Sequence, residues 1–210
     1  MNSKVVIGLG GIQGIGKTSI MRMAMKLLDE NPYPRIIRVA EQFLHCTVYD
    51  KSKVAVIGSY PFWYTMMDLD RSHYAKMGHH QADIEGIVIR YISGLPHKWT
   101  VWIESSMLVN DIFVGTIRAD PLVSSLFLLV TARDEIIADR TTYYDKRNPI
   151  QHCDTDFNEL REKYDMPVVY NNTVSDIDVL GNFVFNASKS MVDKLVYSGK
   201  SARSLSELGY

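Results

Sequence analysis

A glycine-rich segment near the amino terminus constrains the fold of this chain more than any other feature. It reads Gly-Ile-Gln-Gly-Ile-Gly-Lys-Thr over residues 11–18, which fits the pattern G-x-x-x-x-G-K-[ST]. Residues 5–9 before it are apolar, and apolar residues recur with helical spacing between positions 20 and 28. The segment is therefore predicted to join a buried strand to a helix, the context in which this pattern forms a phosphate-binding loop.

The residue types in this loop suit a nucleoside triphosphate. Glycines let the backbone bend closely, so that several N–H groups and the positive end of the next helix converge on phosphate oxygens. Lys17 would reach the β- and γ-phosphates, and the Thr18 hydroxyl would complete the coordination of Mg²⁺. A glycine-rich turn without a ligand would explain the glycines but not the Lys-Thr pair that follows them. The residues expected to bind the nucleotide are Gly11, Gly14, Gly16, Lys17, Thr18 and Ser19.

Composition is compatible with one domain. The chain has 210 residues, of which 46% are hydrophobic, enough to bury one core. We expect a single domain over residues 1–197, followed by a polar tail over residues 198–210. The net charge of -1 gives no global reason to expect nucleic acid or a membrane, although it leaves a local basic groove open.

Cysteine usage and the absence of a long apolar stretch indicate a cytoplasmic protein. Cys46 and Cys153 lie 107 positions apart, as expected for reduced thiols rather than a disulfide framework. No signal peptide is visible before the first predicted strand. No apolar stretch approaches the roughly 20 residues that a membrane span requires, so no membrane partner is expected.

Short apolar strands alternate with helices along the chain. This alternation predicts an α/β fold, a five-stranded and mainly parallel sheet with helices on both faces. A small hairpin of residues 47–49 and 54–57 is predicted as an insertion after the second strand, and a helical lid over about residues 133–165. The strands are expected at residues 5–9, 35–40, 100–103, 126–130 and 167–170, and the helices at 18–28, 82–92, 134–144, 157–164 and about 177–195.

Ligands bind at the carboxyl ends of such strands, so the residues that follow each strand are candidates for function. Glu41 follows the second strand, where it could face the γ-phosphate or could simply be a surface glutamate that caps a helix. Glu104 ends the third strand after three apolar residues, the pattern of a Walker-B acid that would hold Mg²⁺ through water. A plain strand-ending acid is the alternative for Glu104.

Two arginines and an asparagine follow the fourth and fifth strands. Arg140 and Arg147 are seven residues apart, two helical turns, so one face of a helix could present both to the triphosphate. The alternative is a solvated helix end in which Asp139 and Asp145 are their partners. Asn171 begins an Asn-Asn-Thr turn that could approach the nucleotide base or could merely start the last helix.

Two other patterns are not assigned a function. The histidines at positions 45, 73, 79 and 80 match no zinc spacing and have no cysteine partner. Asp83 to Gly86 has the D-x-x-G form of a GTPase switch, but it falls within a helical pattern, and residues 131–134 lack the lysine of a guanine-reading motif. A GTPase switch is therefore disfavoured.

The order of these features resembles the small P-loop kinases, a group that includes adenylate-kinase-like, shikimate-kinase-like and polynucleotide-kinase-like enzymes. The order covers most of the chain, and the loop of residues 11–18 is its one specific motif. The resemblance implies the three-layer α/β/α sandwich of P-loop NTPases and the use of ATP with Mg²⁺. It also implies that Lys17, Arg140 and Arg147 stabilise charge on the transferred phosphoryl group.

Kinases of this group that phosphorylate a hydroxyl typically carry an acid after the second strand. By this resemblance Glu41 is the candidate catalytic base that accepts the hydroxyl proton, although the family usually has the shorter Asp there. Residues 60–64 contain four aromatic side chains that could stack on a base or could pack under the hairpin. With stacking, the chain resembles phage kinases that phosphorylate 5-hydroxymethyluracil in DNA. Basic residues that could meet a DNA backbone are Arg71, Lys76, Lys98, Lys146, Arg147, Lys194, Lys200 and Arg203.

Two other functions remain open at this point. One is a nucleoside monophosphate or other small-metabolite kinase. The other is a P-loop ATPase or nucleotide-dependent regulator that hydrolyses ATP without an acceptor. The sequence indicates neither the oligomeric state nor a preference between ATP and GTP.

Overall fold

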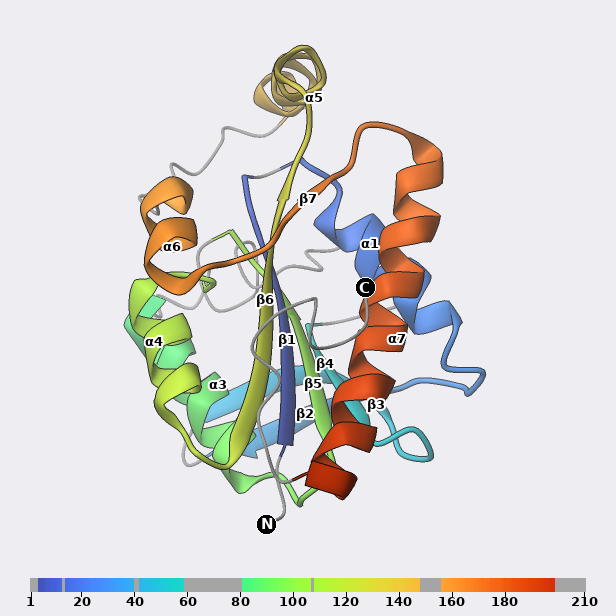
Figure 1. Ribbon diagram of the computed structural model, residues 1–210, viewed down its shortest axis with the longest axis vertical. Helices are drawn as coiled ribbons and strands as arrows, with labels where there is room; N and C mark the ends of the chain where they lie inside the picture. The colour runs from blue at the N-terminus through green and yellow to red at the C-terminus, as the bar shows by residue number, and fades with distance from the viewer. Residues whose placement is uncertain are drawn as a thin grey trace.

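One seven-stranded sheet runs through the protein, and helices lie against both of its faces (Figure 1). The computed structural model describes residues 4–12, 14–39, 42–58, 81–106, 108–147 and 156–198. The strands are β1 (Lys4–Gly10), β2 (Tyr33–Val39), β3 (Gln42–Tyr49), β4 (Val54–Ile57), β5 (Thr100–Glu104), β6 (Val123–Thr131) and β7 (Val168–Tyr170). The helices are α1 (Lys17–Lys26), α3 (Gln81–Gly94), α4 (Asp111–Ala119), α5 (Asp134–Arg147), α6 (Phe157–Tyr164) and α7 (Val174–Ser198).

The sheet has a parallel part and an antiparallel part. Its strand order is β2-β3-β4-β5-β1-β6-β7. Each neighbouring pair from β4 to β7 is parallel, whereas β2 pairs with β3 and β3 with β4 in antiparallel fashion. The carboxyl ends of β1, β5, β6 and β7 therefore meet at one edge, which is the edge where the glycine-rich loop leaves β1.

The predicted five-stranded sheet with a separate inserted hairpin is wrong in its strand count. β3 begins at Gln42 rather than near residue 47, and both strands of the expected hairpin belong to the main sheet. The alternating residues Leu44, Cys46 and Val48 are almost fully buried on one face, which stabilises β3 as a full sheet strand. As a consequence β4, and not β2, lies beside β5.

Two hydrophobic layers hold the helices to the sheet. On one face, Val6, Val101 and Phe127 pack with apolar side chains of α3, α4 and α6. On the other face, Ile7 and Trp102 pack with α1 and α7. Every residue of β1 is buried, as expected for a central strand covered on both sides. Figure 1 shows the two helix groups on opposite sides of the sheet.

Five of the helices agree closely with the sequence prediction, but α4 was not predicted. Its nine residues carry only a short apolar pattern, Phe113, Val114 and Ile117, all buried. Asn110 starts it by accepting a hydrogen bond from the Phe113 backbone N–H. The D-x-x-G pattern at residues 83–86 lies inside α3, as expected. Among the described helices, none is long and apolar enough to cross a membrane.

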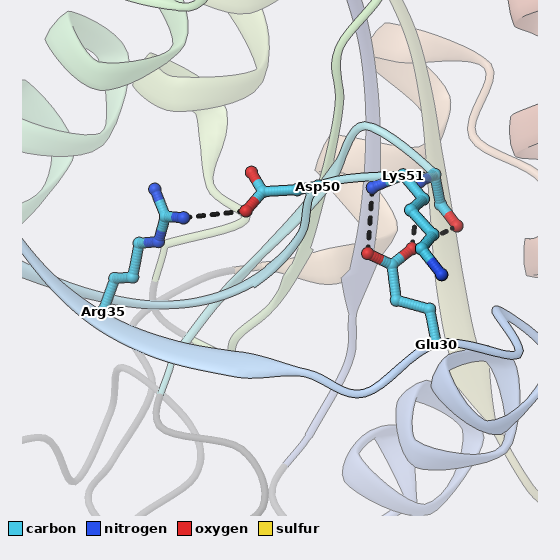
Figure 2. A network of polar contacts seen from close by, with 5 residues as sticks. Glu30, Arg35, Asp50 and Lys51 are labelled. Atoms are coloured by element: carbon cyan, nitrogen blue, oxygen red, sulfur yellow. Dashed lines mark hydrogen bonds and ion pairs between the residues drawn. The ribbon is translucent and has the colours of Figure 1, made fainter.

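Polar contacts at the turn between β3 and β4 connect this part of the sheet to Glu30, in the segment between α1 and β2 (Figure 2). The Glu30 carboxylate accepts hydrogen bonds from the backbone N–H groups of Lys51 and Ser52, at 2.9 and 3.0 Å, and from the Ser52 hydroxyl. Arg35 on β2 forms an ion pair of 2.7 Å with Asp50. The Glu30 contacts hold the β3–β4 turn beside the segment that follows α1, and the ion pair joins β2 to the same turn.

Candidate phosphate-binding site

The loop between β1 and α1 has a backbone that only glycine adopts easily. Gly11, Gly14 and Gly16 have φ values of 131°, 82° and 93°. A Cβ atom on Gly11 would lie 2.3 Å from the Val130 carbonyl oxygen, and one on Gly16 would lie 2.3 Å from Nδ2 of Asn171. These three positions therefore require glycine both for the backbone conformation and, at two of them, for space.

Lys17 points back into this loop. Its side chain is buried, and its Nζ donates to the carbonyl oxygens of Gly11 and Ile12, at 2.9 Å each, and to Oγ of Ser106 at 3.1 Å. These three acceptors are neutral oxygens, and they hold the ammonium between the start of the loop and the segment after β5. A cation fixed in this position, beside glycine N–H groups and the start of α1, suits an anionic ligand.

The end of β5 lies directly beside the end of β1. Leu9 pairs with Glu104, and the Ser105 backbone N–H donates to the Leu9 carbonyl at 3.1 Å. Glu104 is only 1% exposed and Ser106 only 4%. The acid predicted to follow the third strand is therefore adjacent to the loop, as a Walker-B acid would need to be.

The donor set at this point is compatible with Mg²⁺. Glu104 offers a carboxylate, and Thr18, half-buried in the first turn of α1, offers a hydroxyl. No group of three or more His, Cys, Asp or Glu side chains that could hold a metal occurs among the described residues. Mg²⁺ often has few protein ligands and takes the rest from phosphates and water, so the sparse hard-oxygen set fits this ion.

Asn171 and Arg140 reach the same atom of the loop, the carbonyl oxygen of Ile15. Nδ2 of Asn171 donates to it at 2.7 Å, and the Arg140 guanidinium donates at 3.2 Å. Arg140 also donates to the Asn171 carbonyl at 3.0 Å. Asn171 is fully buried, and within the described part of the chain its Oδ1 has no hydrogen-bond partner. The loop, α5 and the turn after β7 therefore meet around one backbone carbonyl.

The structure thus brings together the loop, Lys17, Glu104, Arg140 and Asn171, which are far apart in the sequence. Ser106 and Ile15 take part without having been predicted, because a serine hydroxyl and a backbone carbonyl leave no distinctive pattern. Ser19 is exposed, on the side of α1 that lines a cavity of about 520 Å³ with Met23 and Ile177.

Three predicted features lie outside the described residues. They are Glu41, the aromatic stretch of residues 60–64 and the tail from residue 199 onward. Arg147 ends α5, but only its backbone is described. β2 ends at Val39 and β3 begins at Gln42, and three strands, β3, β4 and β5, separate β2 from β1.

Comparison with known proteins gives no family assignment. No protein-family model matches the sequence, and no curated protein matches it. The resemblance to small P-loop kinases therefore depends on the loop motif and on the order of features along the chain. The functional proposal below is accordingly argued from the site itself.

Proposed function

We propose that this protein is an ATP-dependent phosphotransferase that moves the γ-phosphate to a hydroxyl group. The observation that carries the proposal is the position of Lys17, whose buried ammonium is held by the loop carbonyls of Gly11 and Ile12 and by Ser106. Positive φ values at three glycines give the surrounding loop the shape in which backbone N–H groups can converge on phosphate oxygens. This combination fits triphosphate binding better than it fits a structural turn.

The residues around the loop would act mainly by positioning and by electrostatic stabilisation. Lys17 and the loop N–H groups would bind the β- and γ-phosphates. Glu104 and the Thr18 hydroxyl would hold Mg²⁺, which supplies positive charge that offsets the charge on the phosphate oxygens. The burial of Glu104 and Lys17 lowers the local dielectric constant, so their interactions with a bound charge are stronger than in water.

Arg140 would contribute from a fixed position. One of its nitrogens already donates to the carbonyls of Ile15 and Asn171, which leaves other N–H groups of the guanidinium able to donate to phosphate. Arg147, two turns further along α5, is proposed as the second arginine of this helix. Figure 1 shows α5 beyond the carboxyl end of β6, on the side of the molecule where the loop lies.

The proposed acceptor is a hydroxyl, with 5-hydroxymethyluracil in DNA as the specific candidate. The sequence feature that supports it is the aromatic stretch of residues 60–64 as a stacking surface. Glu41 as the base stays a prediction from the sequence alone, because β4 and β5 separate the strands that flank it, β2 and β3, from β1. The chain leaves β4 at Gly58, on the edge of the sheet that carries the loop, and residues 59–80 follow. β4 is the strand next to β5, so this segment begins two strands away from β1.

The experiment that tests the proposal is transfer of ³²P from [γ-³²P]ATP in the presence of Mg²⁺. The acceptors would be duplex DNA with 5-hydroxymethyluracil, the same duplex with thymine, and a panel of mononucleotides. Label on the modified duplex alone would support the specific acceptor. Label on a mononucleotide would make the protein a metabolite kinase, and release of inorganic phosphate without any labelled acceptor would make it an ATPase and contradict the proposal.

A further inference from the structure

The Lys17 ammonium has one acceptor that differs in kind from the other two. An ammonium carries three N–H groups, and the carbonyls of Gly11 and Ile12 and the hydroxyl of Ser106 can use all three. The two carbonyls belong to the backbone of the glycine-rich loop. Ser106 instead lies just beyond β5, 89 residues further along the chain. A phosphate oxygen that binds this ammonium therefore has to replace one of the three acceptors.

Ser106 is the acceptor that a phosphate can replace most easily. A loop carbonyl moves only when the backbone of the loop turns, whereas the Ser106 hydroxyl moves by a change of rotamer. The backbone before and after this residue is held in place. The Ser105 backbone N–H donates to the Leu9 carbonyl at 3.1 Å, and its hydroxyl accepts from the Leu108 backbone N–H at 2.7 Å. Only the side chain of Ser106 has to move.

The location of Ser106 indicates which phosphate replaces it. Loops of this kind surround the α- and β-phosphates with backbone N–H groups, and their lysine reaches the β- and γ-phosphates. The γ-phosphate then lies beyond the loop carbonyls, where Oγ of Ser106 is 3.1 Å from Nζ of Lys17. Ser106 is also two residues from Glu104, the candidate acid for Mg²⁺. The γ-phosphate and the Ser106 hydroxyl therefore compete for one N–H group of the ammonium.

We propose that Ser106 is the residue by which the protein distinguishes a nucleoside triphosphate from a diphosphate. The proposal deepens the proposed function, since it rests on a triphosphate in the glycine-rich loop. When a γ-phosphate oxygen binds to the Lys17 ammonium, the Ser106 hydroxyl rotates and donates its proton to the same phosphate. The side chain is thus an acceptor in the empty site and a donor in the loaded one. A diphosphate offers no γ-phosphate to which the hydroxyl could donate.

Burial strengthens this contact. Ser106 is 4% exposed and Lys17 is 5% exposed. In such surroundings a hydrogen bond to a charged oxygen contributes more than a bond between neutral groups. The exchange leaves neither group unsatisfied, because the ammonium and the hydroxyl both bind phosphate oxygens. A triphosphate therefore gains a hydrogen bond that a diphosphate lacks.

The test is isothermal titration calorimetry with two ligands, ADP and the non-hydrolysable β,γ-imido analogue of ATP, each with Mg²⁺. In Ser106→Ala the affinity for the analogue relative to ADP should fall about tenfold, the size expected for one hydrogen bond to a charged group. The substitution also removes an acceptor from Lys17 in the empty protein, but this acts on both ligands and cancels in the ratio.

Ser188→Ala is the matched control. Ser188 on α7 is also 4% exposed, and its hydroxyl accepts a hydrogen bond from Nε1 of Trp102 at 3.2 Å. The control therefore removes the same atom from an equally buried serine on another element, and the affinity ratio should stay within twofold of the unaltered protein. Thermal melting of both variants checks that they fold.

Three results would overturn the proposal. The first is an unchanged affinity ratio in Ser106→Ala, even if both affinities fall together, because Ser106 would then only hold Lys17 in place. The second is an equal fall of the ratio in Ser188→Ala, and the third is binding of neither ligand by the unaltered protein. Failure of the proposed function alone would look different. The ratio would fall in Ser106→Ala as expected, while ³²P from [γ-³²P]ATP would appear as inorganic phosphate and never on a hydroxyl acceptor.

Discussion

The glycine-rich loop and the outer strand β2 are built in different ways, and three strands of the sheet separate β2 from β1. Around the loop, Lys17, Glu104 and Asn171 are at most 5% exposed, and their positions depend on contacts between segments that are distant in the sequence. On β2, Arg35, Ile36 and Arg38 are exposed, and their positions depend on the register of one antiparallel pair. Substitutions at the loop should therefore affect phosphoryl transfer and stability together, whereas substitutions of these exposed side chains on β2 should have small effects on both.

Lys17→Ala should have the largest effect on catalysis. It removes the cation from the loop, and we expect phosphoryl transfer to fall by about 1,000-fold or more, because charge on the γ-phosphate loses its main protein partner. The measurement is ³²P transfer under saturating acceptor. Lys26→Ala is the control, since Lys26 is exposed at the other end of α1. Transfer at the normal rate by Lys17→Ala would remove the basis of the proposed function.

Gly16→Ala should have the largest effect on stability. An alanine here needs a φ of 93° and places Cβ 2.3 Å from Nδ2 of Asn171. We therefore expect the free energy of unfolding to fall by about 2–3 kcal/mol. Urea unfolding followed by circular dichroism measures this change. Gly94→Ala at the end of α3 meets no atom within 4 Å and should change the unfolding free energy by less than about 1 kcal/mol.

A second substitution separates the two causes at Gly16. In an Asn171→Ala background the steric contact is gone. Gly16→Ala should then lower the free energy of unfolding by a smaller amount, which corresponds to the backbone strain alone. If the loss from Gly16→Ala is the same in both backgrounds, the contact with Asn171 is not what excludes a side chain at this position.

Arg140→Ala should weaken ATP binding about tenfold, through the loss of a donor to Ile15 and of charge near the phosphates. Isothermal titration calorimetry with ATP and Mg²⁺ measures the change. Arg140 and Asn171 share the Ile15 carbonyl, so their alanine substitutions should be non-additive, with a coupling of about 0.5 kcal/mol or more. Additive effects would mean that the shared carbonyl does not couple the two residues.

Glu30→Gln should have the smallest effect, on the stability of the turn between β3 and β4. Burial would raise the pKa of Glu30, but hydrogen bonds from Lys51 and Ser52 outweigh it, and the pKa lies below its ordinary value of 4.5. The unfolded chain then binds the proton more tightly, so this stability is present above pH 4.5 and is lost as the pH falls through the lower native pKa.

The corresponding measurement is urea unfolding of both proteins at pH 7 and near pH 3. Glu30→Gln should reduce the unfolding free energy by about 1 kcal/mol at pH 7, because an amide oxygen accepts less strongly than a carboxylate. The difference should be smaller at the acid pH. A constant difference at both pH values would show that the charge of Glu30 does not stabilise the turn.

The sequence predicted those parts of the molecule that depend on residues close together in the chain. The loop of residues 11–18 is a continuous motif, and the burial of Glu104 beside it follows from the apolar strand that precedes it. The contacts of Ser106, Ile15 and Arg140 depend on segments that are 89 and 125 residues apart, so no window of the sequence contains them. The seven-residue spacing of Arg140 and Arg147 did not predict the hydrogen bond from Arg140 to the loop.

The sheet was mispredicted for a related reason. The alternation of Leu44, Cys46 and Val48 was present in the sequence. Whether such a segment forms a separate hairpin or joins the main sheet depends on whether a helix packs on its apolar face, and the sequence of the segment does not contain that information. α3 covers this face, so β3 and β4 join the sheet. α4 was missed because nine residues give too few turns for a clear helical period.

The contact of Arg140 and Asn171 with the Ile15 carbonyl makes three segments one cooperative unit. Opening the first half of α5 would remove the hydrogen bond from Arg140 to the Ile15 carbonyl of the loop. The backbone amides near Arg140 should therefore exchange with solvent no faster than the backbone amides of the glycine-rich loop. Residues of α5 beyond Arg140 are not tied by this contact. Any opening of the helix that preserves the order of the loop must therefore hinge on the carboxyl side of Arg140.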